Sequence, residues 1–416
     1  MALTSLAPLR HRSYALSATS SFISSIGTWM QSVALGVYLT VTTHNPVWLG
    51  LITMAQWLPA IIGSPLGGAI ADRWDRQHWI QACNLVMALT SGSLAYLELT
   101  HHLRPIDAVY LAIGEGFASS ASWAAFQSLL PDLVEPDEVL AAVSLGSAQF
   151  NLGRVIGPVL AAVTLSLGSP GICFLLNALS FVFVLVMFSF VRTKPRARVE
   201  TKLRLVAETK VGARRAWSVA GCRNPILGVA TVAFIVSPFI SLVPAMAIEV
   251  LHAGKVGTSW LVTAQGVGAV VGALTLPTLA KRTTRIFVLR ASLTTMVVAV
   301  ALYAEAPTLV TSVVALFFLG GAYVGTLTGL NTSVQLHAPV AERSRILALY
   351  TLTLSIFFPF GALVQSALAK LWGVRVVTLS SGLVLAVALT LVTWRAPRFF
   401  HEMSSPSVGE GAVLAD

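Results

Sequence analysis

Charge is scarce in this chain. Only 11% of its 416 residues are Asp, Glu, Lys or Arg, whereas a soluble globular protein carries about 25%. Hydrophobic residues make up 56% of the chain and the mean hydropathy is +0.79, which excludes a soluble globular protein. Apolar runs of about twenty residues recur along almost the whole length. Because each run can cross a hydrocarbon layer about 30 Å thick, the sequence predicts an all-α membrane protein.

The residues needed for catalysis and for metal binding are also scarce. Three cysteines form neither a disulfide framework nor a metal-binding spacing. His101 and His102 are adjacent, with no carboxylate at ligand spacing. The chain has no nucleophile–base set, no Gly-x-x-x-x-Gly-Lys-Ser/Thr loop for ATP and no nucleic-acid recognition pattern. We therefore expect neither an enzyme nor an ATP-driven pump, with no cofactor, no metal and no nucleic-acid partner.

The apolar runs predict twelve transmembrane helices. They are expected at 14–41, 47–71, 79–100, 106–130, 138–168, 170–192, 224–251, 257–281, 286–304, 307–334, 344–371 and 374–395. A basic stretch divides them into six and six. The sequence thus predicts an N-terminal six-helix bundle (1–192), a basic cytoplasmic linker (193–223), a C-terminal six-helix bundle (224–396) and a cytoplasmic tail (397–416).

The two predicted bundles are related by an internal repeat. "SLLPDLVEPDEVLAAVSL" (128–145) follows the fourth span, and "SVQLHAPVAERSRILALY" (333–350) follows the tenth. Their apolar rhythm and acidic turn agree without close identity. Two pseudo-symmetric bundles joined by a linker are the layout of transporters that rock about a central site.

The positive charges predict the orientation. With the N-terminus in the cytoplasm, 22 of the 27 Lys and Arg residues fall on the inner side and four on the outer side. Since cytoplasmic loops collect Lys and Arg, we expect a multi-pass protein of the cell (inner) membrane with both termini inside. The net charge of +10 is then directed at the anionic inner leaflet.

The loop between the second and third spans carries a family signature. "GGAIADRWDRQ" (67–77) resembles the Gly-x-x-x-Asp-Arg-x-Gly-Arg loop of the major facilitator superfamily. "GTWMQSVAL" (27–35), "LLPDLV" (129–134), "NLGRVIGP" (151–158) and "LLNALSF" (175–181) are similar to the bacterial branch of enterobactin exporters and macrolide efflux permeases. The resemblance covers the whole chain and implies secondary active transport.

The resemblance also implies a conformational latch on the cytoplasmic side. Asp72 would place a negative charge at the positive N-terminal end of the eleventh span, which begins "ERSRIL". The alternative is a turn that its charges merely keep soluble. Asp75 replaces the usual second glycine, and the matching loop "AKRTTR" (280–285) lacks the aspartate. The candidate latch residues are Gly68, Asp72, Arg73, Arg76, Arg343 and Arg345.

One basic residue, Arg154, lies in the middle of the fifth span, where a charge needs a partner or a wet cavity. Glu115 of the fourth span is its candidate partner. Both residues lie about 25 Å from the turn that joins the two spans, at ~1.5 Å per residue. We expect the pair to line a central cavity, with Glu115 taking up and releasing a proton. The alternative is a permanent structural ion pair.

Other residues of the spans are candidates for movement and for substrate contact. Gly157 and Pro158 are expected to form a hinge in the fifth span, because proline removes a backbone hydrogen bond. This segment resembles part of the antiporter signature, although Ala161 and Ala162 stand where glycines are expected. The amides that can line the cavity, or instead bond neighbouring helices, are Gln31, Asn151, Gln265, Asn331 and Gln365.

These features favour a monomeric secondary exporter in the lipid bilayer. Its expected substrate is an amphipathic organic compound of the drug (multidrug) or siderophore type, leaving the cytoplasm by alternating access in exchange for protons. The alternatives are an importer of a polar solute, which would need more charged and hydrogen-bonding groups in its cavity, and a membrane protein without transport activity.

Overall fold

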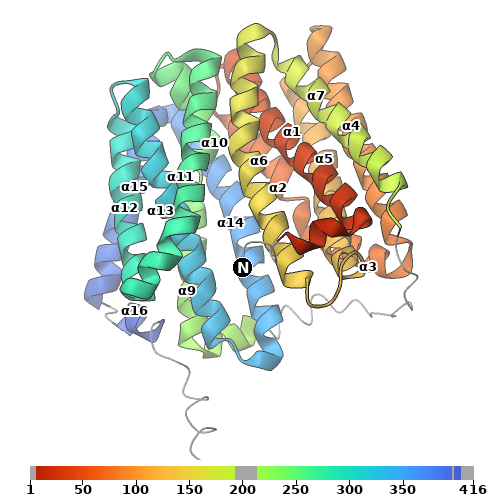
Figure 1. Cartoon of the computed structure of the whole chain (residues 1–416). Helices are drawn as coiled ribbons and strands as arrows, with labels where there is room; N and C mark the ends of the chain where they lie inside the picture. The colour runs from red at the N-terminus through yellow and green to blue at the C-terminus, as the bar shows by residue number, and fades with distance from the viewer. Residues whose placement is uncertain (1–5, 193–212, 396–397, 404–416) are drawn as a thin grey trace, which may run out of the picture. The chain divides into compact units, whose positions relative to one another are not determined.

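The computed structural model describes residues 6–192, 213–395 and 398–403, except for the side chains of Asp72 and Ala341. Contacts divide the chain into two compact units (Figure 1). Unit 1 comprises Met1–Leu203 and Val243–Thr263, and unit 2 comprises Arg204–Leu242 and Ala264–Asp416. Most of the predicted linker, 193–212, and the tail from 404 lie outside the described residues.

Unit 1 contains the first six spans. A short 3₁₀ turn, η1 (Ala7–Arg10), precedes α1, and a second one, η2 (Leu130–Asp132), follows α5. The long helices are α1 (Arg12–Thr43), α2 (Val47–Trp57) with α3 (Ala60–Arg73), α4 (Arg76–Leu99), α5 (Pro105–Leu129), α6 (Val139–Leu167) and α7 (Pro170–Ser189). Within the predicted linker, the described residues 213–218 are helical.

The remaining spans begin with a broken seventh span: α9 (Ala220–Ile235), α10 (Phe239–Ala245) and the π-helical η3 (Met246–Val250). The following helices are α11 (Gly254–Arg282), α12 (Arg285–Glu305), α13 (Leu309–His337), α14 (Arg343–Trp372) and α15 (Val374–Arg395), with η4 (Val340–Glu342) before α14 and α16 (Arg398–Glu402) at the end. No strand occurs in the described parts of the chain.

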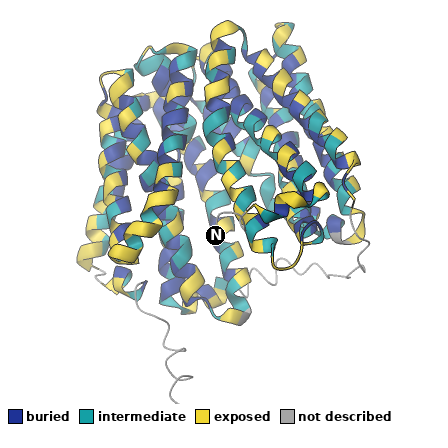
Figure 2. Cartoon of the chain, in the orientation of Figure 1, coloured by how far each residue is buried: buried dark blue, intermediate teal, exposed yellow. Residues whose placement is uncertain are grey.

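The predicted fold class is confirmed. Among the described residues, eleven helical segments are long and apolar enough to cross a membrane. The remaining predicted span corresponds to α5, which carries Glu115 and Asp107. Large apolar side chains are exposed on the helices, such as Leu302 at 61% and Leu383 at 57% (Figure 2). Their exposure is the expected one where lipid tails are the solvent.

The same three pairs of spans pack in both units. In unit 1, α1 packs on α6, α3 on α5 and α4 on α7. In unit 2, α9 packs on α14 and α12 on α15, and α11 meets α13 through glycines. In unit 1, span 1 thus pairs with span 5, span 2 with span 4 and span 3 with span 6. In unit 2, span 7 pairs with span 11, span 8 with span 10 and span 9 with span 12. The internal repeat seen in the sequence is therefore also a repeat of packing.

Glycines bring the paired helices into backbone contact. A Cβ atom on Gly67 of α3 would lie 2.5 Å from the Cα of Ala121 in α5, and one on Gly272 of α11 would lie 2.8 Å from the Cα of Gly321 in α13. Helices in lipid associate through such close packing, because no hydrophobic effect separates them from the lipid tails.

The break in the seventh span has a local cause. Residues 236–238 form a turn, and Pro238 has no N–H to donate to the carbonyl oxygen of Phe234. The Nε2 of Gln365 in α14 donates to that oxygen at 3.2 Å and also to the carbonyl oxygen of Ile235. A side chain from the paired span thus satisfies the backbone group that the proline leaves free.

One segment differs from the predicted bundle boundaries. Val243–Thr263 was expected in the second bundle but groups with unit 1. Pro244 lies against α1 there, since a Cβ on Gly36 would come within 2.7 Å of its ring. The change of unit along the chain follows the break in the seventh span.

We expect Gly268→Ala to destabilise the protein. A methyl group at this position of α11 would overlap the carbonyl oxygen of Phe317 in α13, and overpacking of this kind costs about 1–3 kcal/mol. The melting temperature of the purified protein should fall by several degrees. Gly146→Ala in α6 is the matched control. A Cβ there meets no described atom within 4 Å, so the melting temperature should stay the same or rise. Equal shifts for the two variants would contradict the packing argument.

Candidate functional site

A buried polar network joins four helices of unit 1. The Nε2 of Gln31 in α1 donates to Glu115 Oε2 in α5 at 2.6 Å. The Oε1 of the same Gln31 accepts from Asn177 Nδ2 in α7 at 3.0 Å. Asn177 also reaches Ser91 Oγ in α4 at 3.4 Å and accepts from Ser180 at 3.2 Å. Glu115 is 9% exposed and Gln31 1%, so an ionisable group lies inside the unit with one defined hydrogen-bond donor.

Arg154 lies on a different side of α1. Its guanidinium carbon is 5.5 Å from the ring centroid of Trp29, and Trp29 packs edge-on against Phe150 at 5.8 Å. Among the described side chains, no ion pair joins Arg154 and Glu115. Arg154 also takes part in a further interaction.

These contacts agree with the predicted equal depth of Glu115 and Arg154 along their helices. They do not agree with the prediction that the two side chains point toward each other. The α1 partners of the two residues, Gln31 and Trp29, are two positions apart, a rise of about 3 Å. Residues at i and i+2 of a helix point to different sides. Glu115 and Arg154 therefore contact α1 at nearly one depth and on different faces, and their joint role in a cavity stays a prediction.

The expected hinge residues hold the fifth span close to the first. A Cβ on Gly157 would lie 2.6 Å from the Cβ of Trp29 and 2.8 Å from the carbonyl oxygen of Ile26. Pro158 is buried inside α6, which continues without a break from Val139 to Leu167. The proline thus lies in a continuous helix at a point of tight packing, and hinge motion at this point stays a prediction.

The four remaining candidate amides have different surroundings. Gln365 satisfies backbone carbonyls at the break of the seventh span. Asn151 donates to Ser147 O in its own helix at 2.8 Å, and Asn331 accepts from Gln335 at 2.7 Å. Gln265 is 1% exposed, and its Nε2 has no hydrogen-bond acceptor in the described part of the chain. Since buried donors are nearly always paired, Gln265 is the best candidate among these amides for a substrate contact.

The signature loop is held to the loop after α5 by Arg76. Its Nη1 lies 2.8 Å from Asp132 Oδ2 and 3.1 Å from the carbonyl oxygen of Ser128. The two side chains are only 21% and 14% exposed. Arg76 therefore ties the turn before α4 to the turn after α5 within unit 1.

Other predicted latch residues are less constrained. A Cβ on Gly68 would meet no described atom within 4 Å, so Gly67 rather than Gly68 makes the close contact of this pair. Arg73 is exposed in the last turn of α3. Asp72 belongs to the same turn, but its side chain lies outside the described part of the structure. The predicted latch through Asp72 is therefore untested.

Asp75 starts α4 by capping it. Its Oδ1 accepts from the backbone N–H groups of Gln77 at 2.9 Å and His78 at 3.1 Å. Partial burial alone would raise the pKa of Asp75, but these bonds and the His78 ring together hold it below the usual 3.8. The ionised carboxylate thus stabilises the folded loop above pH 3.8, and this stabilisation is lost as the pH falls through the lowered pKa.

The predicted partners at the start of the eleventh span lie in unit 2. Arg345 is exposed, and Arg343 is partly buried with no acceptor for its Nε in the described chain. The Oε2 of Glu342, the residue before α14, lies 3.1 Å from the Nε of Arg215. This ion pair connects the helical residues 213–218 to the turn before α14.

Comparison with known proteins identifies the fold. Residues 3–409 match the family described as transmembrane secretion effectors. The chain belongs to this family of major facilitator superfamily transporters. It is therefore a multi-pass membrane protein of a transporter family and not an enzyme. The resemblance seen in the loop signature is confirmed.

The similar curated proteins include two kinds of transporter. The staphyloferrin A transporter of Staphylococcus aureus is 28% identical over 170 residues, and the match covers 41% of this chain and 43% of that protein. The chain thus spans less than half of this relative. The enterobactin exporter EntS of Salmonella paratyphi A is 26% identical over 341 residues, 79% of each chain. EntS of Citrobacter koseri is 25% identical over 400 residues, 94% of each chain.

Solved structures show the same fold at low identity. A bacterial homologue of the human lysosomal transporter Spinster has a TM-score of 0.76 at 14% identity, covering 95% of this chain and 99% of that one. A point mutant of the nucleoside transporter NupG has a TM-score of 0.75 at 13% identity, covering 91% and 99%. At such identities the likeness extends to the fold alone.

Several contacts of this family member were not expected from its sequence. His11 Nε2 lies 2.6 Å from Glu138 Oε2, joining the starts of α1 and α6. Asn224 Nδ2 donates to Glu402 Oε2 at 2.8 Å, which anchors α16 on α9. In the sequence, these residues are visible only as polar side chains near the ends of apolar helices. Such a position does not predict which residue is the partner.

We expect the Arg76–Asp132 pair to contribute measurably to stability. Arg76→Ala or Asp132→Ala alone should lower the melting temperature, because each removes the opposite charge beside a largely buried ionised group. The double variant should melt at nearly the same temperature as the less stable single variant. This corresponds to a coupling free energy of about 1–3 kcal/mol between the two side chains. The exposed Arg104–Asp107 pair is the control, with a coupling below about 1 kcal/mol. Additive effects at Arg76 and Asp132 would show that the pair is not coupled.

Proposed function

We propose that this transporter exports a siderophore-type amphipathic compound across the cytoplasmic membrane, in exchange for protons, by alternating access. Two kinds of relative support the substrate class: the staphyloferrin A transporter and the enterobactin exporters. The word exporter in the name of the relatives that match over most of the chain supports the outward direction. A broader drug efflux activity is the neighbouring alternative within the same mechanism.

The single observation that carries proton exchange is the position of Glu115. It is the buried carboxyl of the unit 1 network, and its described hydrogen-bond donor is the neutral Gln31 amide rather than a cation. A carboxyl in such surroundings can hold a proton as a neutral acid and lose it when water gains access. A bond to a neutral amide survives both states, since the carboxyl oxygen remains an acceptor. Glu115 is therefore the proposed proton carrier.

Arg154 and Gln265 are the proposed substrate contacts. The Arg154 guanidinium lies over Trp29, and this arrangement offers a cation and an aromatic face to an anionic or aromatic group of a chelator. Gln265 offers a buried amide donor without an acceptor among the described residues, which suits the oxygen atoms of such a compound. Neither contact requires a metal or a cofactor of the protein.

The setting of this mechanism follows from charge. We propose the inner membrane with both termini in the cytoplasm, because Lys and Arg concentrate on that side of the predicted spans. The protein is proposed to work as a monomer, with the proton gradient as its energy source and no bound cofactor.

We expect Glu115→Gln to abolish gradient-driven export while leaving a folded protein. The amide retains an oxygen that can accept from Gln31, but it cannot release a proton. Export of enterobactin and of a panel of fluorescent drugs should be measured in inverted vesicles with an imposed pH gradient. The rate for the variant should fall at least ten-fold, which corresponds to about 1.4 kcal/mol in the barrier.

Glu305→Gln is the matched control, because it makes the same chemical change at an exposed helix end and should leave the rate unchanged. Arg154→Ala should also lose transport, but mainly through weaker substrate binding. Export that is insensitive both to a protonophore and to Glu115→Gln would remove proton exchange from the mechanism. If the protein supports uptake of the substrate and no export, the proposed direction of transport is wrong and the protein is an importer.

We expect Asp72→Asn to slow turnover several-fold, because the substitution removes the charge that the proposed latch needs. Asp75→Asn is the control in the same loop. Asn caps a helix as well as Asp does, so this variant should transport at the normal rate. Initial rates in proteoliposomes test both variants. If the two variants transport equally well, the loop has no latch function at Asp72.

A further inference from the structure

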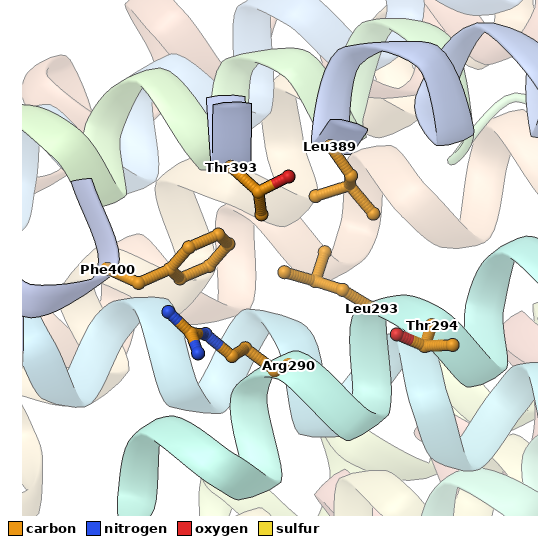
Figure 3. Close-up of a pocket in the computed structure, with 6 residues that line it drawn as sticks. All are labelled: Arg290, Leu293, Thr294, Leu389, Thr393 and Phe400. Carbon is orange, nitrogen blue, oxygen red and sulfur yellow. The ribbon is translucent and has the colours of Figure 1, made fainter. Parts of the chain in front are cut away.

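A pocket of about 380 Å³ lies at one end of unit 2, between α12, α15 and α16. Figure 3 shows the six side chains that line it: Arg290, Leu293, Thr294, Leu389, Thr393 and Phe400. A cation, two hydroxyl-bearing side chains and an aromatic ring thus share one cavity with two leucines. Nothing in the transport proposal uses these residues.

Arg290 supplies the charge of the pocket. Its guanidinium carbon lies 4.7 Å from the centroid of the Phe400 ring, and such stacking holds the planar group in one orientation. Arg290 is exposed. Among the described residues, no carboxylate forms an ion pair with it. An oriented arginine without a carboxylate partner is suited to bind a phosphate.

The wall that carries Phe400 is anchored to the rest of unit 2. Asn224 donates both to Glu402 and to the carbonyl oxygen of Phe399, at 2.8 and 3.2 Å. Phe400 itself is only 3% exposed. The short helix α16 is therefore a fixed part of the pocket, in the part of the chain that the structure describes.

The position of the pocket along its helices matches the lipid headgroup region. Arg290 is five residues from the start of α12, about 8 Å along the axis, and Thr393 is two residues from the end of α15. Arg285 and Arg395 occupy these helix ends. The pocket thus lies about one turn inside a basic boundary, where anionic headgroups gather.

The other side of the pocket is apolar. Leu293 and Leu389 line it, and exposed aliphatic side chains continue along the same face of α12. They are Val298 at 52% and Leu302 at 61% exposure, four and eight residues beyond Thr294. A ligand with a phosphate and a long hydrocarbon chain matches both parts, whereas a free anion would leave the leucines without a partner.

We propose that this pocket binds one anionic phospholipid, with the phosphate on Arg290 and the acyl chains along α12. Thr294 and Thr393 offer hydroxyl groups to the headgroup. Basic pockets between membrane helices on the cytoplasmic side are suited to such lipids in general. The site lies within unit 2 and does not depend on the substrate or on proton exchange.

Native mass spectrometry of the delipidated, full-length protein tests this proposal. Phosphatidylglycerol and phosphatidylcholine with identical acyl chains are titrated separately, and bound lipids are counted. The wild type should bind one phosphatidylglycerol in preference to phosphatidylcholine. Arg290→Gln should weaken this first binding step about five-fold, the effect expected for one basic side chain near an anionic headgroup. Equal binding by the wild type and Arg290→Gln would overturn the proposal.

Two further variants and a competitor complete the test. Arg282→Gln removes an exposed charge at the end of α11 and should leave the first binding step unchanged. Leu389→Trp fills the pocket without removing charge and should also weaken binding, so the result does not depend on the folding of a single variant. If Arg282→Gln and Arg290→Gln weaken binding equally, only net charge matters and the site is wrong. If inorganic phosphate at millimolar concentration displaces the lipid completely, the pocket is an anion site rather than a lipid site.

Discussion

Helices in a bilayer gain little from hiding apolar side chains, because the surrounding lipid is equally apolar. The fold therefore depends on close backbone contact between paired spans. Gly67 against α5 and Gly272 against α13 provide this contact at equivalent places of the two repeats. Gly157 does the same between the fifth and first spans, and Gly361 does so between the eleventh and seventh, where an added Cβ would lie 2.8 Å from the Cα of Phe234. Where an ordinary helix bundle would rely on a hydrophobic core, this one relies on residues without side chains.

The sequence was sufficient for the helices and insufficient for their contacts. Hydropathy predicted each span to within about four residues, because crossing the bilayer imposes a length and excludes charge. The break after Ile235 was not predicted, although Pro238 is visible in the sequence, because a membrane helix can tolerate proline when a neighbour satisfies the freed carbonyl. That neighbour, Gln365, is 131 residues away from Phe234. Periodicity carries no information about such a partner.

Glu115 shows the same limit at the candidate site. Counting residues from the turn gave its depth, since the rise per residue is constant. The direction of a side chain depends on how its helix is rotated, and apolar surroundings on all sides leave no amphipathic pattern to fix that rotation. Gln31 was among the predicted polar residues of the spans, but its bond to Glu115 follows only from the packing of α1 on α5. The sequence therefore predicted which polar residues lie within the spans, but it did not predict which of them form hydrogen bonds with one another.

The two repeats have kept their packing and diverged in chemistry. In unit 1 a carboxyl group, Glu115, lies deep in the fourth span, within a network of amides and hydroxyls. In the described spans of unit 2, carboxylates occur only near helix ends, at Glu305 and Glu342. The buried polar groups there are amides and hydroxyls, such as Gln365 at the proline break, together with the imidazole of His337. Because Glu115 is the proposed proton carrier, the proposed coupling is confined to the first repeat. The second repeat then contributes neutral contacts and, at its basic end, the pocket around Arg290.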